Sequence, residues 1–184
     1  ADLAAVVSFH GSLETASPAA PGAVQPRLLV CTGAADPFVP TEHVDGLRAE
    51  MEAAGARCEI IAYPDVIHAF TNPGASARGE RFGLPLRYDE GADKDSWARM
   101  AALLMYAHRA GTQFVIENPA DRGDATQPDV FLHADHGPLW LMPAIYALSR
   151  HAATKLVTFA MCAFGAEWQK MTTLMYTAGI SPVH

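Results

Sequence analysis

The sequence has few of the features that mark membrane, nucleic-acid-binding or secreted proteins. No apolar run approaches the ~20 residues that a membrane-spanning helix requires. Basic residues are scarce, with 13 Lys and Arg against 20 Asp and Glu, so nucleic acid is not the expected partner. The cysteines are odd in number and widely spaced, at Cys31, Cys58 and Cys162, which fits neither a disulfide framework nor a zinc site. We therefore expect a reducing, cytoplasmic setting, with no cofactor and no metal.

The first residues also lack the features of a secretory signal. Residues 1–6 have no basic flank and include the acidic Asp2, and an apolar run starts at once. Half of all residues are hydrophobic and 18% are charged, a balance that is typical of folded globular proteins. The 184 residues are enough for one domain with a sizeable core, or for two small ones.

The apolar pattern predicts an α/β fold with a mainly parallel sheet and flanking helices. The continuous apolar run Leu3–Phe9 is typical of a strand buried on both faces, and apolar, β-prone residues predict further strands at Arg27–Thr32 and Arg57–Tyr63. Apolar residues at helical spacing predict a helix that has Thr41 as its N-cap and ends at Gly55. A strand, a helix and a strand of these lengths form a right-handed βαβ unit.

The rest of the chain predicts a second, smaller α/β segment. A Gly- and Pro-rich stretch at 71–88 predicts irregular structure, and a long helix follows at 92–110, before Gly111. Further elements are a strand, a polar loop, a helix and two strands, at 113–117, 119–138, 139–151, 155–160 and 172–177. We place the boundary between the two segments at residues 105 and 106, which gives domains at 1–105 and 106–184.

Two polar residues follow neighbouring predicted strands, at the sheet edge where open α/β folds carry their chemistry. Asp36 comes after the second strand and His68 after the third. In a nucleophile–His–Asp triad the carboxylate accepts a hydrogen bond from one ring nitrogen, and the other nitrogen takes the nucleophile's proton. The placement fits that acid–base pair. It equally fits an Asp that opens a turn before Pro37 and a His packed in a loop.

Several separate motifs in residues 1–105 resemble the carboxyl-terminal half of the dienelactone hydrolase family. In chain order they are His10-Gly11-Ser12-Leu13, Gly33-Ala34-Ala35-Asp36-Pro37-Phe38-Val39-Pro40, His68-Ala69-Phe70-Thr71-Asn72-Pro73, Tyr88-Asp89 and Ala92-Asp93-Lys94-Asp95-Ser96-Trp97. The resemblance implies part of an α/β-hydrolase fold, with Asp36 as the triad acid and His68 as the base. It also implies a small-molecule ester or lactone substrate, attacked by a Cys or Ser on a sharp strand-to-helix elbow.

The sequence departs from this family because it has no nucleophile elbow. Gly-x-Ser/Cys-x-Gly occurs nowhere in the 184 residues, and we expect the elbow and the oxyanion-hole loop to lie upstream of the first strand. Ser12, at a strand end, and Cys31, inside a strand, are weaker candidates for the nucleophile. We therefore expect the chain alone not to be a competent hydrolase. A different hypothesis is a non-catalytic interaction module that self-associates through the open edge of the first strand.

Two motifs of the second segment have competing explanations. Short stretches resemble the carboxyl-terminal part of cytosine-specific DNA methyltransferase-like proteins, namely Phe114-Val115-Ile116-Glu117-Asn118-Pro119, Leu139-Trp140-Leu141-Met142-Pro143, Met161-Cys162-Ala163-Phe164-Gly165 and Gln169-Lys170-Met171-Thr172-Thr173. That resemblance implies that Glu117 contacts a flipped cytosine, whereas the same residues also fit a plain exit from a strand into a loop. His133, Asp135 and His136 could ligate a metal ion, but no fourth ligand lies at a suitable spacing, so we interpret them as polar loop residues.

Overall fold

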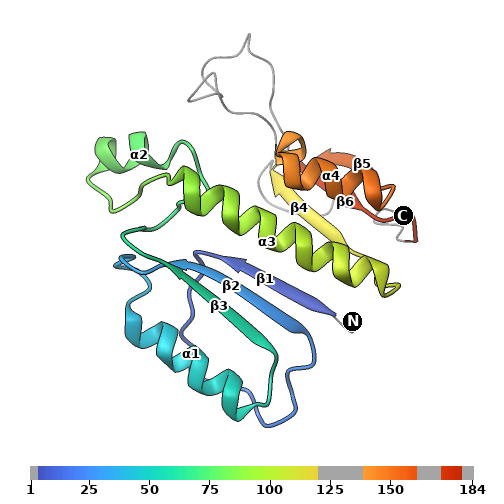
Figure 1. Ribbon diagram of the computed structural model, residues 1–184. Coiled ribbons are helices and arrows are strands. Elements are labelled where there is room, and N and C mark those ends of the chain that lie inside the picture. Colours follow the sequence, from blue (N-terminus) through green and yellow to red (C-terminus); the bar gives the residue numbers. More distant parts are fainter. Residues whose placement is uncertain (1–3, 120–138, 161–170, 180–184) are drawn as a thin grey trace. The chain divides into compact units, whose positions relative to one another are not determined.

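The computed structural model describes residues 4–119, 139–160 and 171–179 (Figure 1). The chain divides into two compact units, Ala1–Met100 and Ala101–His184, and each is described by itself. The domain boundary at residues 105 and 106 stays a prediction. Across the described ranges, none of the helices has the length and apolar character needed to cross a membrane.

The first unit is built on a parallel sheet of three strands. Strands β1 (Ala5–Phe9), β2 (Arg27–Gly33) and β3 (Cys58–Tyr63) are hydrogen-bonded in the order β1-β2-β3. The central strand is the most deeply buried, and Cys31 and Thr32 have no exposed surface. Its continuous apolar run is what a strand covered on both faces requires. The predicted α/β fold with a parallel sheet is confirmed.

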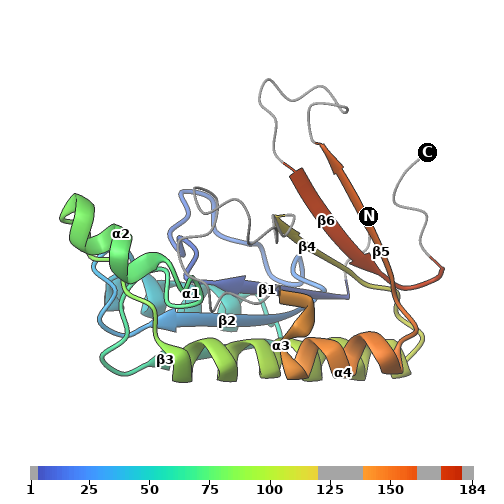
Figure 2. The same ribbon diagram turned by 90° about the horizontal axis from the view of Figure 1, so that it is seen from above.

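Helices cover both faces of this sheet (Figures 1 and 2). Helix α1 (Thr41–Ala53) joins β2 to β3 on one face, and the amino-terminal part of α3 (Glu90–Arg109) lies on the other. Phe9 of β1 packs edge-to-face on Trp97 of α3, with 4.6 Å between the ring centroids. Each helix therefore buries one apolar stripe against the sheet.

Helix α1 differs from the prediction at its amino-terminal end and agrees with it at its carboxyl-terminal end. The helix begins at Thr41 itself, and the N-cap position belongs to Pro40, which makes no side-chain capping bond. Its φ of −61° is already set by the proline ring, so the helix starts without a capping hydroxyl. At the other end Gly55 adopts φ +68°, the left-handed conformation predicted for the residue that ends this helix.

The stretch predicted to be irregular contains a helix, so that prediction was wrong. Helix α2 spans Ala75–Phe82 and ends at Gly83, which adopts φ +64°. Gly79 sits inside this helix, where a Cβ would lie 2.4 Å from the carbonyl oxygen of Leu86. The glycine that suggests a loop in the sequence instead permits close packing of α2 on the segment that follows it.

The second unit contains an antiparallel sheet. Its strands are hydrogen-bonded in the order β4-β6-β5, with bounds Val115–Pro119, Met171–Tyr176 and Lys155–Ala160. The strand-helix-strand pattern of the sequence therefore does not continue the parallel arrangement. Helix α4 (Pro143–His151) begins later than predicted, after a 3-10 turn at Leu139–Leu141, because a proline without an N–H group fits best at the first helical position.

Gly33 allows the loop after β2 to lie directly against the loop after β3. A Cβ at this position would be 2.2 Å from the carbonyl oxygen of Val66 and 2.7 Å from its carbonyl carbon. Two backbone hydrogen bonds hold the same approach, from Ala34 N–H to the Tyr63 carbonyl (2.8 Å) and from Ala35 N–H to the Val66 carbonyl (3.0 Å). Any side chain at position 33 would push these two loops apart.

We predict that Gly33→Ala lowers the free energy of unfolding by about 2 kcal/mol or more, because the added methyl group clashes with backbone that cannot move independently. Gly46→Ala is the matched control. Gly46 lies within α1 and a Cβ there would meet nothing within 4 Å, so this variant should be stabilised by up to ~1 kcal/mol. Chemical denaturation of both variants measures the difference, and an equal effect at the two positions would contradict the prediction.

Candidate active site

Asp36 is fixed by the turn that follows β2. Its backbone carbonyl accepts from the N–H of Val39 (3.2 Å), and its Oδ1 accepts from the N–H of Phe38 (2.9 Å). Only 3% of the residue is exposed, and its side chain is fully buried. A buried carboxylate is tolerated where its oxygens accept hydrogen bonds. This turn leaves Oδ2 for a second partner.

His68 is that partner, and it lies on the loop after β3. Its Nδ1 is 2.8 Å from Oδ2 of Asp36. The loop is shaped by two non-glycine residues in the left-handed region, Asp65 (φ +58°) and Ala69 (φ +64°), on either side of His68. The carbonyl of His68 accepts from the N–H of Arg87 (3.1 Å), so the chain beyond α2 also holds this loop.

The structure thus brings together the two residues that the sequence placed at neighbouring strand ends. Nδ1 of His68 faces the carboxylate. The other ring nitrogen, Nε2, makes no hydrogen bond to any residue in the described parts of the chain. The His68 side chain is 27% exposed, whereas that of Asp36 is fully buried. This is the arrangement in which a carboxylate fixes the imidazole tautomer and leaves Nε2 for proton transfer. That the two residues are catalytic stays a prediction.

Two aromatic rings beside His68 were not among the predicted site residues. The ring of His10, after β1, has its centroid 5.1 Å from that of His68, and the ring of Phe38 is 5.2 Å away, both edge-to-face. Phe38 is 50% exposed, so part of its ring is open to solvent. Both residues belong to the motifs of the sequence analysis. Only the fold shows that their rings meet at His68.

Neither weaker candidate for the nucleophile has the environment that this role requires. Cys31 is completely buried, and the hydroxyl of Tyr63 lies 3.9 Å from its sulfur. Burial raises the pKa of the Cys31 thiol to about 11, so the reactive thiolate is scarce near neutral pH. Ser12 is exposed, and no hydrogen bond within the described ranges joins it to His68. Cys31 packs as a small core residue instead.

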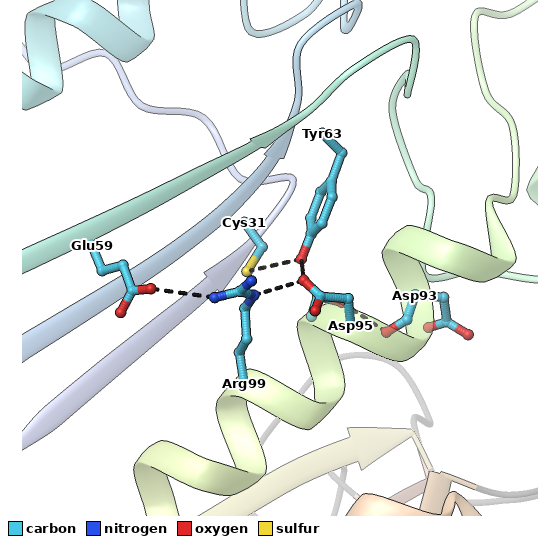
Figure 3. A network of polar contacts seen from close by, with 7 residues as sticks. Cys31, Glu59, Tyr63, Asp93, Asp95 and Arg99 are labelled. Atoms are coloured by element: carbon cyan, nitrogen blue, oxygen red, sulfur yellow. Dashed lines mark hydrogen bonds and ion pairs between the residues drawn. The ribbon is translucent and has the colours of Figure 1, made fainter.

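A polar network between the sheet and α3 surrounds the hydroxyl of Tyr63, at the end of β3 (Figure 3). Oδ2 of Asp95 accepts from the Tyr63 hydroxyl (2.8 Å) and from Nε of Arg99 (2.6 Å), and Arg99 also reaches Glu59 (3.4 Å). The bond from Arg99 lowers the pKa of Asp95, and burial followed by the bond to Asp95 raises that of Tyr63. Arg99, Asp95 and Glu59 are exposed enough for solvent to weaken the ion pairs, so the network orients Tyr63 more than it stabilises the fold.

Asp93, in the first turn of α3, is a buried carboxyl group that lies near these residues (Figure 3). Its Oδ2 accepts from the hydroxyl of Tyr88 (3.0 Å), while Oδ1 is buried and has no hydrogen-bond partner in the described ranges. Burial raises the pKa of Asp93 to about 6, against the smaller lowering effect of the bond from Tyr88. Folding therefore makes this carboxyl group easier to protonate than it is in the unfolded chain.

We predict that Asp93 makes the protein less stable as the pH rises. Because the folded-state pKa is above the unfolded one, the contribution is full below about pH 4 and is lost as the pH passes about 6. Asp93→Asn should remove this dependence. The free energy of unfolding of the variant relative to the parent should then rise by about 2 kcal/mol between pH 4.5 and pH 7.5.

Denaturation of the parent, Asp93→Asn and Asp45→Asn at both pH values measures this change. Asp45 is exposed on α1, so its variant is the control for the loss of one carboxylate. If the two variants show the same pH dependence relative to the parent, the explanation by burial of Asp93 is wrong.

Comparison with known proteins relates this geometry to one family. The model of the dienelactone hydrolase family matches residues 1–107. Two proteins provisionally named carboxymethylenebutenolidase are each 37% identical, one of Salmonella typhimurium over 71 residues (37% of this chain, 22% of the relative) and one of Salmonella typhi over 68 residues (35% and 20%). The match therefore spans about a fifth of the length of these relatives.

A solved structure is similar to about half of this chain. It is a dienelactone hydrolase-like promiscuous phosphotriesterase from metagenomic libraries, 31% identical, with a TM-score of 0.48 over 55% of this chain and 41% of that one. None of these comparisons supports the resemblance of residues 113–184 to DNA methyltransferase-like proteins. Glu117 lies exposed on β4, and the His133, Asp135 and His136 cluster lies outside the described residues.

Proposed function

This chain belongs to the dienelactone hydrolase family, and from that membership we propose that it carries the acid–base pair of a hydrolase acting on carboxylic esters or lactones. The observation that supports the proposal most directly is the 2.8 Å contact between Nδ1 of His68 and Oδ2 of the buried Asp36. We take the substrate class from the family and from the name of the two Salmonella relatives, carboxymethylenebutenolidase, because a butenolide is a lactone.

In the proposed mechanism Asp36 orients and His68 transfers the proton. A Cys or Ser supplied by sequence outside these 184 residues gives its proton to Nε2 of His68 and bonds to the carbonyl carbon of the substrate. His68 then gives that proton to the leaving alkoxide oxygen as its bond to carbon breaks, which leaves an acyl-enzyme. Water releases the acyl group by the same steps, with Nε2 again acting first as base and then as acid.

The free edge of β1 offers a place for the segment that carries the nucleophile. Within the described residues β1 pairs only with β2, so its outer backbone groups face no strand there, and Val6 is 37% exposed. We propose that a further strand pairs here and places the elbow beside His68. The alternative is that the same edge pairs with a second copy of the chain, as an interaction module would.

The test uses a chimera in which the elbow-bearing amino-terminal part of a dienelactone hydrolase precedes this chain. We predict that the chimera hydrolyses p-nitrophenyl acetate, and that His68→Ala lowers kcat about 10³-fold or more because the base is lost. Asp36→Asn should lower kcat by at least ~10²-fold, because the imidazole tautomer is no longer fixed. The chain without the added part should show no His68-dependent hydrolysis.

His43→Ala in the chimera is the matched control. His43 lies on α1, where its ring approaches Glu14 (3.7 Å) rather than any residue of the site, so hydrolysis should be unaffected. An active chimera that is indifferent to His68→Ala would refute the proposed role. His68-dependent turnover by the chain alone would show that it contains its own nucleophile.

Self-association is a separate proposal with a separate measurement. If two copies pair through β1, sedimentation of the purified chain should show a concentration-dependent dimer, and Val6→Lys should shift it to monomer because a charged edge resists pairing. A monomer at all concentrations would exclude this alternative.

A cytoplasmic location also stays a proposal, supported by the free thiols of Cys31 and Cys58.

A further inference from the structure

His10 occupies a constrained position at the carboxyl end of β1. Its φ is +41°, in the left-handed region that residues with a side chain seldom adopt. Its N–H donates to the Cys31 carbonyl (2.8 Å), which continues the β1–β2 ladder by one residue. The strained backbone is therefore held by the neighbouring strand, and it directs the side chain toward the loops that carry Asp36 and His68.

The side chain of His10 contacts the His68 loop at three residues. Its ring lies edge-to-face on the rings of His68 (5.1 Å between centroids) and Phe70 (5.4 Å), and its Nε2 is 3.0 Å from Oγ1 of Thr71. Phe70 has no exposed surface, so this side of the loop is packed into the core. Together these contacts fix the plane of the His10 ring beside that of His68.

The surroundings of His10 favour its uncharged form. Burial lowers its pKa, and the adjacent His68 lowers it further, while the more weakly acting Asp36 has the opposite effect. His68 and Asp36 are also the titratable side chains that act on it from the two neighbouring loops. A neutral ring at this position can pack against a His68 that becomes positively charged during proton transfer, whereas a second cation would repel it.

We propose that His10 is a positioning residue for His68. Its ring, together with that of Phe38, holds the imidazole plane in which Nδ1 faces Asp36, and it limits the access of water to that hydrogen bond. The consequence for catalysis depends on the proposed hydrolase function. The positioning itself does not, so the two can be tested separately.

The primary test is proton NMR of the 184-residue chain with its histidines labelled with ¹⁵N. A ring N–H held by a buried carboxylate gives a far-downfield signal that exchanges slowly with water. The signal of His68 is identified by its loss in His68→Gln. We expect it in the parent and in His10→Phe, which keeps an aromatic ring, and we expect exchange at least ten times faster in His10→Ala and His10→Gln.

Controls separate positioning from a loss of folding. His43→Ala removes a half-buried histidine away from the site and should leave the His68 signal unchanged, and the backbone amide spectrum reports whether each variant is folded. If His10→Ala does not fold, the comparison of His10→Gln with His10→Phe decides. Unchanged exchange in His10→Gln, a lost signal in His10→Phe, or no downfield signal in the parent would each overturn the proposal.

The activity of the chimera distinguishes this inference from the proposed function. If both hold, His10→Gln should lower kcat about tenfold with little change in KM, and His10→Phe should restore most of the loss. A chimera indifferent to His68→Ala would refute the proposed function while the NMR result still decides the role of His10. His68-dependent hydrolysis combined with unchanged exchange in His10→Gln would refute the role of His10 alone.

Discussion

The loops after β2 and β3 lie against each other because position 33 has no side chain, and the candidate site depends on this approach. The space beside Gly33 is filled by the carbonyl group of Val66, two residues before His68. Backbone hydrogen bonds from Ala34 and Ala35 join the two loops, and these bonds do not involve the side chains of Asp36 and His68. The 2.8 Å contact of Asp36 with His68 depends on this backbone arrangement. Burying the Asp36 carboxylate costs desolvation free energy, so the contact alone would not hold two separated loops together.

The parts of this fold that rest on local patterns could be predicted from the sequence. Apolar, β-prone runs indicate the strands, and β2 is buried as a strand covered on both faces must be. The same environment predicted for β1 was wrong, because none of its residues is buried in the structure. The proximity of Asp36 and His68 could be predicted because each follows an apolar strand, and parallel strands end at one edge of the sheet. Gly55 was recognised because the left-handed end of a helix favours glycine.

The parts that rest on tertiary contact could not be predicted in this way. Gly79 suggests a break in the chain, and only its packing on the Leu86 carbonyl explains why a helix tolerates it. His10 lies far from His68 in sequence and meets it because β1 is parallel to β2, in a register that places Phe9 opposite Cys31. In the second unit, the direction of β6 depends on pairing with β4 and β5, which the apolar periodicity of one strand does not specify.

Asp36 lies inside a single crossover unit formed by β2, α1 and β3, and His68 lies on the loop directly after it. All the backbone hydrogen bonds described between their two loops close within residues 33–66, so the separation of acid and base is set inside one short supersecondary unit. Because the entropic cost of closing a loop rises with its length, holding the two loops together inside this one unit costs less than joining segments that lie farther apart in the chain. Both residues can therefore be inherited as one block. Recombination elsewhere in a gene would leave the contact between Asp36 and His68 intact.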